Sequence, residues 1–144
     1  MIMKKSYANE PKQTENEYRQ TEGLLIGTQR HMLVGYWEWN LETQKYVWND
    51  EMYQIFNLAP QQFSPRTGTF FNCVHPADRN EVVRAFGKAL VGKQPYNIEH
   101  RIVWPDGSVR FVKGKAEVTF KGGRPTHIWG IVQDITDKRQ FEEQ

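Results

Sequence analysis

The sequence contains a single cysteine, Cys73, among its 144 residues. One thiol excludes a disulfide within the chain and fits a reducing compartment. No apolar run approaches the ~20 residues that a membrane-spanning helix needs, and residues 1–10 lack the apolar stretch of a secretory signal. We therefore expect a cytoplasmic domain that does not insert into a membrane, although it can belong to a larger membrane-bound protein.

Charge of one sign is also scarce, because the formal net charge is only +2 and no block of lysine or arginine stands out. This argues against a nucleic-acid partner. No metal-ligand spacing of the H-x-x-x-H or C-x-x-C type is present, nor is a nucleophile–base pair or a glycine-rich phosphate loop. We expect a non-catalytic domain and no metal site. A stand-alone small-molecule enzyme is the alternative from another class.

Aromatic side chains, by contrast, are abundant at 13% of the residues, including five tryptophans. Most follow Gly35, where Trp37 and Trp39 alternate with polar residues. This alternation predicts a half-buried strand with both indoles on one face. Residues 45–48 predict a second strand, paired with the first as a hairpin.

The middle of the chain carries helix signals. Asn49 or Asp50 can cap a short helix, and Asn57 suits the left-handed conformation at the end of that helix. A brief apolar segment follows at residues 69–74. Pro76 then suits the start of a longer helix that ends at Gly92, so we interpret His75 and Asp78 as structural rather than acid–base residues. The stripe expected to be buried on this helix is Val82, Val83, Phe86, Ala89 and Leu90.

Three strands are predicted at residues 96–104, 108–120 and 126–135, joined by the turns at 105–107 and 121–125. A charged helix follows to Gln144. With the first hairpin, these strands predict an α+β domain built on one five-stranded antiparallel sheet. The chain then divides into a leader with a flanking helix at residues 1–33, a domain at 34–136, and the start of a linker helix at 137–144.

This order of elements resembles the PAS (Per-Arnt-Sim) family, in the subclass common in bacterial receptors. The resemblance covers residues 34–139, and Asn40 and Asn57 depart from the residues frequent in the family at those positions. It implies the sheet order 2-1-5-4-3, with short helices on one face and flanking helices at both ends. The motifs that carry it are Gly35-Tyr-Trp-Glu-Trp-Asn-Leu41, Trp48-Asn-Asp-Glu-Met-Tyr53, Val74-His-Pro-Ala-Asp78, Glu99-His-Arg101, Pro105-Asp-Gly107 and Gly130-Ile-Val-Gln-Asp-Ile-Thr136.

The resemblance implies a sensory or relay module of a larger signalling protein, of the histidine kinase or cyclic-dinucleotide enzyme type. The cofactor is unknown, and the sequence argues against both flavin and haem. The flavin motif of light-sensing relatives matches only at Asn72-Cys73, Val132 stands where those relatives place a glutamine, and residues 78–92 lack the haem-binding histidine. A small planar or apolar ligand could occupy an interior pocket, whose candidate residues are Trp37, Trp39, Tyr53, Phe56, Phe70, Ile98, His100 and Val132.

The alternative is a filled aromatic core without a ligand, in a domain that serves only for dimerisation. Either way, we expect a homodimer through the N-terminal helix and the sheet face, and a covalently linked output domain. In the family, the element at Asp134-Ile-Thr136 couples the core to the output helix. We therefore expect Asp134 to pair with a basic residue or accept hydrogen bonds, and Thr136 to cap the helix that follows.

Overall fold

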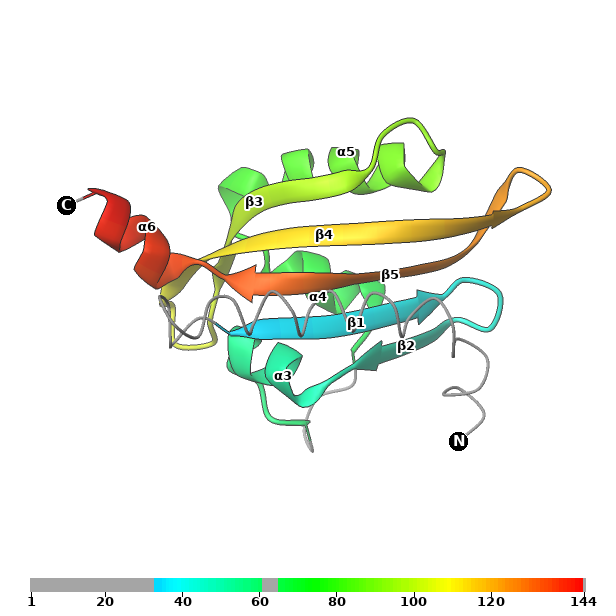
Figure 1. Cartoon of the computed structure of the whole chain (residues 1–144). Coiled ribbons are helices and arrows are strands. Elements are labelled where there is room, and N and C mark those ends of the chain that lie inside the picture. Colours follow the sequence, from blue (N-terminus) through cyan, green and yellow to red (C-terminus); the bar gives the residue numbers. More distant parts are fainter. Residues whose placement is uncertain (1–32, 61–64, 144) are drawn as a thin grey trace.

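Five antiparallel strands form one sheet in the spatial order β2-β1-β5-β4-β3, as Figure 1 shows. In the computed structural model of the chain, residues 33–60 and 65–143 are described. The strands are β1 (Val34–Asn40), β2 (Lys45–Trp48), β3 (Tyr96–Val103), β4 (Val109–Lys121) and β5 (Arg124–Asp134). The predicted α+β class and sheet order are confirmed. The predicted leader helix lies outside the described residues.

The helices between β2 and β3 supply the cover for one face of the sheet. They are α3 (Asp50–Phe56), α4 (Thr67–Cys73), the 3₁₀ turn Pro76–Asp78 and α5 (Arg79–Leu90). We call this covered side, which carries Trp37 and Val132, the inner face, and the opposite side, with Tyr36 and Trp129, the outer face. Helix α6 (Thr136–Glu143) follows β5 after one residue and projects from the end of the sheet (Figure 1).

Helix α3 begins and ends as its sequence predicts. The Asn49 side chain accepts hydrogen bonds from Met52 N at 3.1 Å and from Tyr36 N at 3.0 Å, so it caps the helix and ties it to β1. Asn57 ends the helix in the left-handed conformation, with φ of 55°. The helix lies so close to β1 that a Cβ on Gly35 would stand 2.7 Å from Met52 Cγ. Only glycine fits this contact.

The segment before α5 covers the free edge of β3, which is an edge strand of the sheet. His75 Nδ1 accepts from Ala77 N at 3.1 Å and so begins the 3₁₀ turn. Arg101 O accepts from His75 N at 2.9 Å, and Arg101 N donates to Asp78 Oδ2 at 2.8 Å. These bonds satisfy backbone groups that an open edge would offer to another strand. His75 and Asp78 therefore each have a structural role at the start of this segment.

Three details differ from the sequence predictions. The apolar segment at residues 69–74 lies mostly in helix α4. Val83 is 52% exposed, because the buried stripe of α5 follows Val82, Phe86 and Ala89 at helical spacing and leaves Val83 beside it. Strand β1 is buried on both faces rather than one, since Glu38 on the outer face is only 1% exposed. On that face, Glu38 Oε1 lies 3.1 Å from Nε2 of His127 on β5.

Candidate functional site

The inner face of β1 carries the two tryptophans that the sequence singled out. Trp37 is buried and stacks between Tyr46 and Phe86, with each ring centroid 6.2 Å away. Trp39 is half-buried and stacks on Tyr46 at 5.7 Å. Phe86 of α5 also contacts Trp39, at 6.4 Å. The two indoles therefore form one wall of an aromatic interior that β2 and α5 close.

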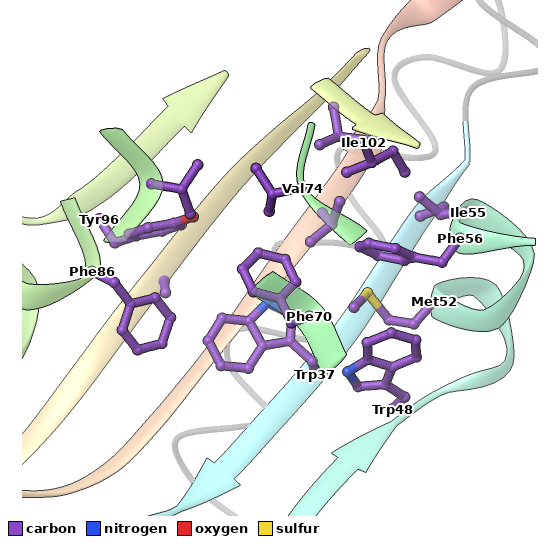
Figure 2. Close-up of a cluster of buried hydrophobic side chains, with 14 of the residues drawn as sticks. Trp37, Trp48, Met52, Ile55, Phe56, Phe70, Val74, Phe86, Tyr96 and Ile102 are labelled. Carbon is purple, nitrogen blue, oxygen red and sulfur yellow. The ribbon is translucent and has the colours of Figure 1, made fainter. Parts of the chain in front are cut away.

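A second group of aromatic rings fills the interior beside α3 (Figure 2). Phe56 is 1% exposed and lies between Trp48, at 5.0 Å between centroids, and Phe70, at 6.1 Å. Tyr53 lies edge-on to Trp48 at 5.3 Å and is half-buried. Burial and the nearby Asp50 carboxylate raise the pKa of Tyr53 above its usual range. These rings belong to one continuous cluster of buried side chains.

His100 lies on the inner face of β3 and is 6% exposed. Its ring stands edge-on to Phe70 at 6.1 Å, and its Nδ1 is 3.1 Å from Arg101 O. Burial lowers the pKa of His100, which keeps the imidazole neutral. A neutral ring that donates from Nδ1 to this carbonyl leaves Nε2 as an acceptor. Ile98, half-buried, and Val132, 4% exposed, also pack against the cluster.

Two tyrosines of this interior, the half-buried Tyr46 and the buried Tyr96, were not among the residues that the sequence singled out. Tyr46 on β2 and Tyr96 on β3 both have a pKa raised by burial. Tyr96 is 4% exposed, its ring contacts Phe86 at 5.5 Å, and its buried hydroxyl has no hydrogen-bond partner. Figure 2 shows this hydroxyl directed toward the middle of the cluster. The alternation of Tyr96 with Ile98 and His100 was the signal that could have identified it.

The junction between β5 and α6 depends on Asp134, which is 5% exposed. Its Oδ2 accepts from Arg110 Nε of β4 at 2.9 Å, and its Oδ1 accepts from Thr136 N at 2.9 Å. One carboxylate thus binds both the sheet and the first turn of the exit helix, where a negative charge also stabilises the helix dipole.

Thr136 does not cap the helix as the sequence suggested. It is the first residue of α6, and its Oγ1 accepts from Phe111 N of β4 at 2.9 Å. The capping role belongs to Asp134, because its side chain is the one that reaches the free N–H group of the first turn. The hydroxyl instead fastens the helix to the neighbouring strand.

A second anchor lies one turn further along α6. The Arg139 guanidinium stands 4.4 Å from the centroid of the Phe111 ring and 3.2 Å from Glu99 Oε1. Both partners come from the outer face of β3 and β4. The exit helix is therefore held to the sheet at its first turn and again at Arg139.

A groove of about 440 Å³ opens on the outer face over β3, β4 and β5. Its lining residues are Pro95, Tyr96, Asn97, Lys113, Lys115, Ala116, Glu117, Trp129, Gly130, Ile131 and Gln133.

Cys73 is half-buried, and burial raises the pKa of its thiol. Within residues 33–60 and 65–143, no three histidine, cysteine or acidic side chains gather as metal ligands would, and no helix is long and apolar enough to cross a bilayer.

The fold agrees with a comparison against known protein families. The family model described as the PAS fold matches residues 45–132, which is more than half of the chain. The chain belongs to the PAS fold family. The resemblance seen in the motifs is thereby confirmed. In this PAS domain, Val132 and the cluster around Phe56 lie inside the sheet and helices, and Asp134 lies at the exit.

Curated relatives of this PAS domain are much longer proteins. "Probable diguanylate cyclase DgcE" of Escherichia coli K12 is 28% identical over 136 residues, which are 94% of this chain and 12% of that protein. The blue-light-activated histidine kinase of Brucella ovis is 30% identical over 109 residues, which are 76% of this chain and 22% of that protein. The chain therefore spans less than a quarter of either relative.

Solved structures show the same fold. A sensory box histidine kinase/response regulator from Burkholderia thailandensis superposes with a TM-score of 0.66 at 21% identity, over 84% of this chain and 88% of that one. The N-terminal domain of a diguanylate cyclase with a PAS/PAC sensor from Marinobacter aquaeolei gives 0.65 at 18% identity, over 74% and 98%.

Proposed function

We propose that this chain is a non-catalytic sensory or relay domain that passes a change in its interior, or at a dimer interface, to the exit helix α6. The observation that carries the proposal is the double attachment of Asp134 to Arg110 on the sheet and to Thr136 N on the helix. A shift of β5 or β4 alters the geometry of this carboxylate, and with it the direction of α6. Allostery in this sense needs two states with different contacts at the junction.

The output is a covalently linked domain of the histidine kinase or diguanylate cyclase type. Relatives with those names support this part of the proposal, since the chain matches only 12% and 22% of their lengths and leaves room for such domains. The single cysteine supports a cytoplasmic location.

The signal is a small planar or apolar molecule bound among the aromatic rings near Phe86. The buried hydroxyl of Tyr96, which lacks a partner, supports a ligand with a hydrogen-bond acceptor, because an unsatisfied buried donor is unfavourable. The acceptor nitrogen of His100 supports a donor group on the same molecule. Aromatic walls with a few polar groups are typical of small-molecule pockets.

A domain that only dimerises is the second candidate. The close ring contacts around Phe56 and Trp37 favour it, because they already fill much of the interior. In both cases we propose a homodimer through the sheet face and the N-terminal helix.

Two measurements on the purified chain separate the candidates. Native mass spectrometry reveals a bound small molecule, and a thermal-shift screen reveals ligands that stabilise the fold. A hit whose stabilisation weakens in Tyr96→Phe supports the sensor, because that change removes only the hydroxyl. A dimer by sedimentation that no molecule of the screen stabilises supports the dimerisation module.

Coupling to output is tested with Asp134→Ala in the protein that carries this domain. We expect signal-dependent output to be lost while the domain remains folded. Asp137→Ala is the matched control, because Asp137 is exposed in the same turn of α6. Unchanged signal dependence in Asp134→Ala would remove the proposed role of the junction.

A further inference from the structure

Trp104 was not among the residues that the sequence singled out. It follows β3 at the turn into β4 and is half-buried. Its indole Nε1 donates to Ile55 O at 2.8 Å, across 49 residues of sequence. Ile55 lies in the last turn of α3 and is fully buried. Carbonyl groups in the last turn of a helix lack partners within the helix, so the indole satisfies a group that α3 itself leaves free.

The ring of Trp104 also contacts the exit junction. The Arg110 guanidinium carbon stands 5.1 Å from the centroid of the Trp104 ring. Arg110 Nε donates to Asp134 Oδ2 at 2.9 Å. Asp134 in turn accepts from Thr136 N. The contacts therefore run without a gap from the end of α3, through one indole and one guanidinium, to the first turn of α6.

We propose that Trp104 is a positioning residue that couples helix α3 to the exit helix. The inference rests on the proposed relay function and adds a route to it. Helix α3 carries Tyr53 and Phe56, two of the candidate pocket residues. A ligand or a strain in the interior that displaces α3 moves the Ile55 carbonyl away from the indole N–H.

The coupling is directional because a hydrogen bond from an indole weakens steeply with misalignment. When this bond breaks, the indole loses its fixed orientation and its face turns away from Arg110, which weakens the cation–π contact. Arg110 is 28% exposed and then gains competing contacts with water, so Asp134 holds α6 less tightly.

The test is residue-resolved hydrogen exchange on the full chain, comparing the amides of Thr136 and Arg139 in α6 with amides in the β4–β5 ladder. Trp104→Phe keeps an aromatic face for Arg110 but removes the donor to Ile55. We expect exchange in α6 to rise about fivefold beyond any change in the ladder, as the loss of one hydrogen bond implies. Phe120→Leu is the control, because this 39% exposed ring on β4 lies outside the candidate pocket and ten residues along the strand from Arg110, and it should leave the ratio unchanged.

Thermodynamic coupling must also act in the reverse direction. Asp134→Asn breaks the ion pair with Arg110 and should speed exchange of Asn57 and Leu58, whose amides bond to carbonyls of α3. Exchange that rises equally throughout the chain in Trp104→Phe, or an α3 end that Asp134→Asn leaves unchanged, would overturn the coupling. Both readouts need no ligand and no output domain, so they fail independently of the proposed function.

Discussion

The aromatic interior and the exit junction differ in the forces that hold them. The interior is held by ring contacts between side chains such as Phe56, Trp48 and Phe70, whose attraction depends on buried area more than on direction. The junction is held by a few polar bonds, chiefly those of the Asp134 carboxylate, which accepts at 2.9 Å from Arg110 and from Thr136 N. Such bonds depend strongly on geometry.

This difference suggests a division of roles. Substitutions in the interior should change the free energy of unfolding by several kcal/mol and affect every element alike. Substitutions at the junction should have smaller effects on stability but should act selectively on α6. The following predictions test this contrast, from the largest expected effect to the smallest.

Phe56→Ala should have the largest effect on stability. Phe56 is 1% exposed, and deleting a buried phenyl ring lowers the free energy of unfolding by about 3–5 kcal/mol. Urea denaturation followed by tryptophan fluorescence measures it. Phe120→Ala is the control, since Phe120 is 39% exposed and its loss should change stability by less than about 1 kcal/mol. Similar losses in the two variants would contradict the assignment of Phe56 to the core.

Arg110→Gln should weaken the junction by about 2 kcal/mol, because it leaves the buried Asp134 carboxylate without its charged partner. Arg124→Gln is a matched control: Arg124 is 71% exposed and 3.9 Å from Glu42, so its removal should have little effect. The free energy of unfolding and the helical signal of α6 are the readouts. An equal effect of the two arginines would mean that burial of Asp134 does not strengthen its ion pair.

Acid should weaken the link between α5 and β3. The Arg101 guanidinium, 2.7 Å from Asp78, lowers the pKa of that carboxyl from 3.8 to about 2. Because the pKa of this carboxyl is lower in the folded chain than in the unfolded chain, the pair stabilises the fold at pH values above the unfolded pKa. This contribution is lost as the pH falls from about 4 toward 2. Because the pair is partly exposed, we expect about 1 kcal/mol. The urea midpoints at pH 7 and pH 3 should differ less in Asp78→Asn than in the native chain, and identical acid sensitivity would exclude this pair as a cause.

Glu99→Gln should have the smallest effect. Glu99 and Arg139 are 50% and 38% exposed, and such pairs contribute at most about 0.5 kcal/mol. The cation–π contact of Arg139 with Phe111 persists in this variant. Amide exchange of Arg139 should rise slightly while the ladder amides stay unchanged, and a global loss of stability would show that this anchor belongs to the core.

Local features were predictable wherever neighbouring residues decide them. The cap at Asn49, the left-handed Asn57 and the start of the 3₁₀ turn at His75 follow from side chains within a few residues of the affected backbone. Helix α4 was not predicted, because no side chain caps its N-terminus and the sequence therefore carries no start signal for it. The burial of the outer face of β1 was not predicted, because alternation shows which residues share a face but not whether the other face is also covered.

The candidate pocket was predictable only in part. Inward-facing positions such as Trp37 and Phe70 follow from periodicity and from the family resemblance. Tyr96 escaped attention because its unsatisfied hydroxyl depends on what surrounds it in the folded chain. Whether the interior binds a ligand stays a prediction.

The sequence by itself determined the α+β class, the order of the strands along the chain and the position of Asp134 at the exit, because these follow from local periodicity, turn residues and motif order. Only the tertiary structure decided that Arg110 is the partner of Asp134, that Thr136 bonds to β4 instead of capping α6, and that Trp104 reaches Ile55. The reason is physical: each of these contacts joins atoms at least 24 residues apart, and their geometry exists only once the sheet has brought the strands together.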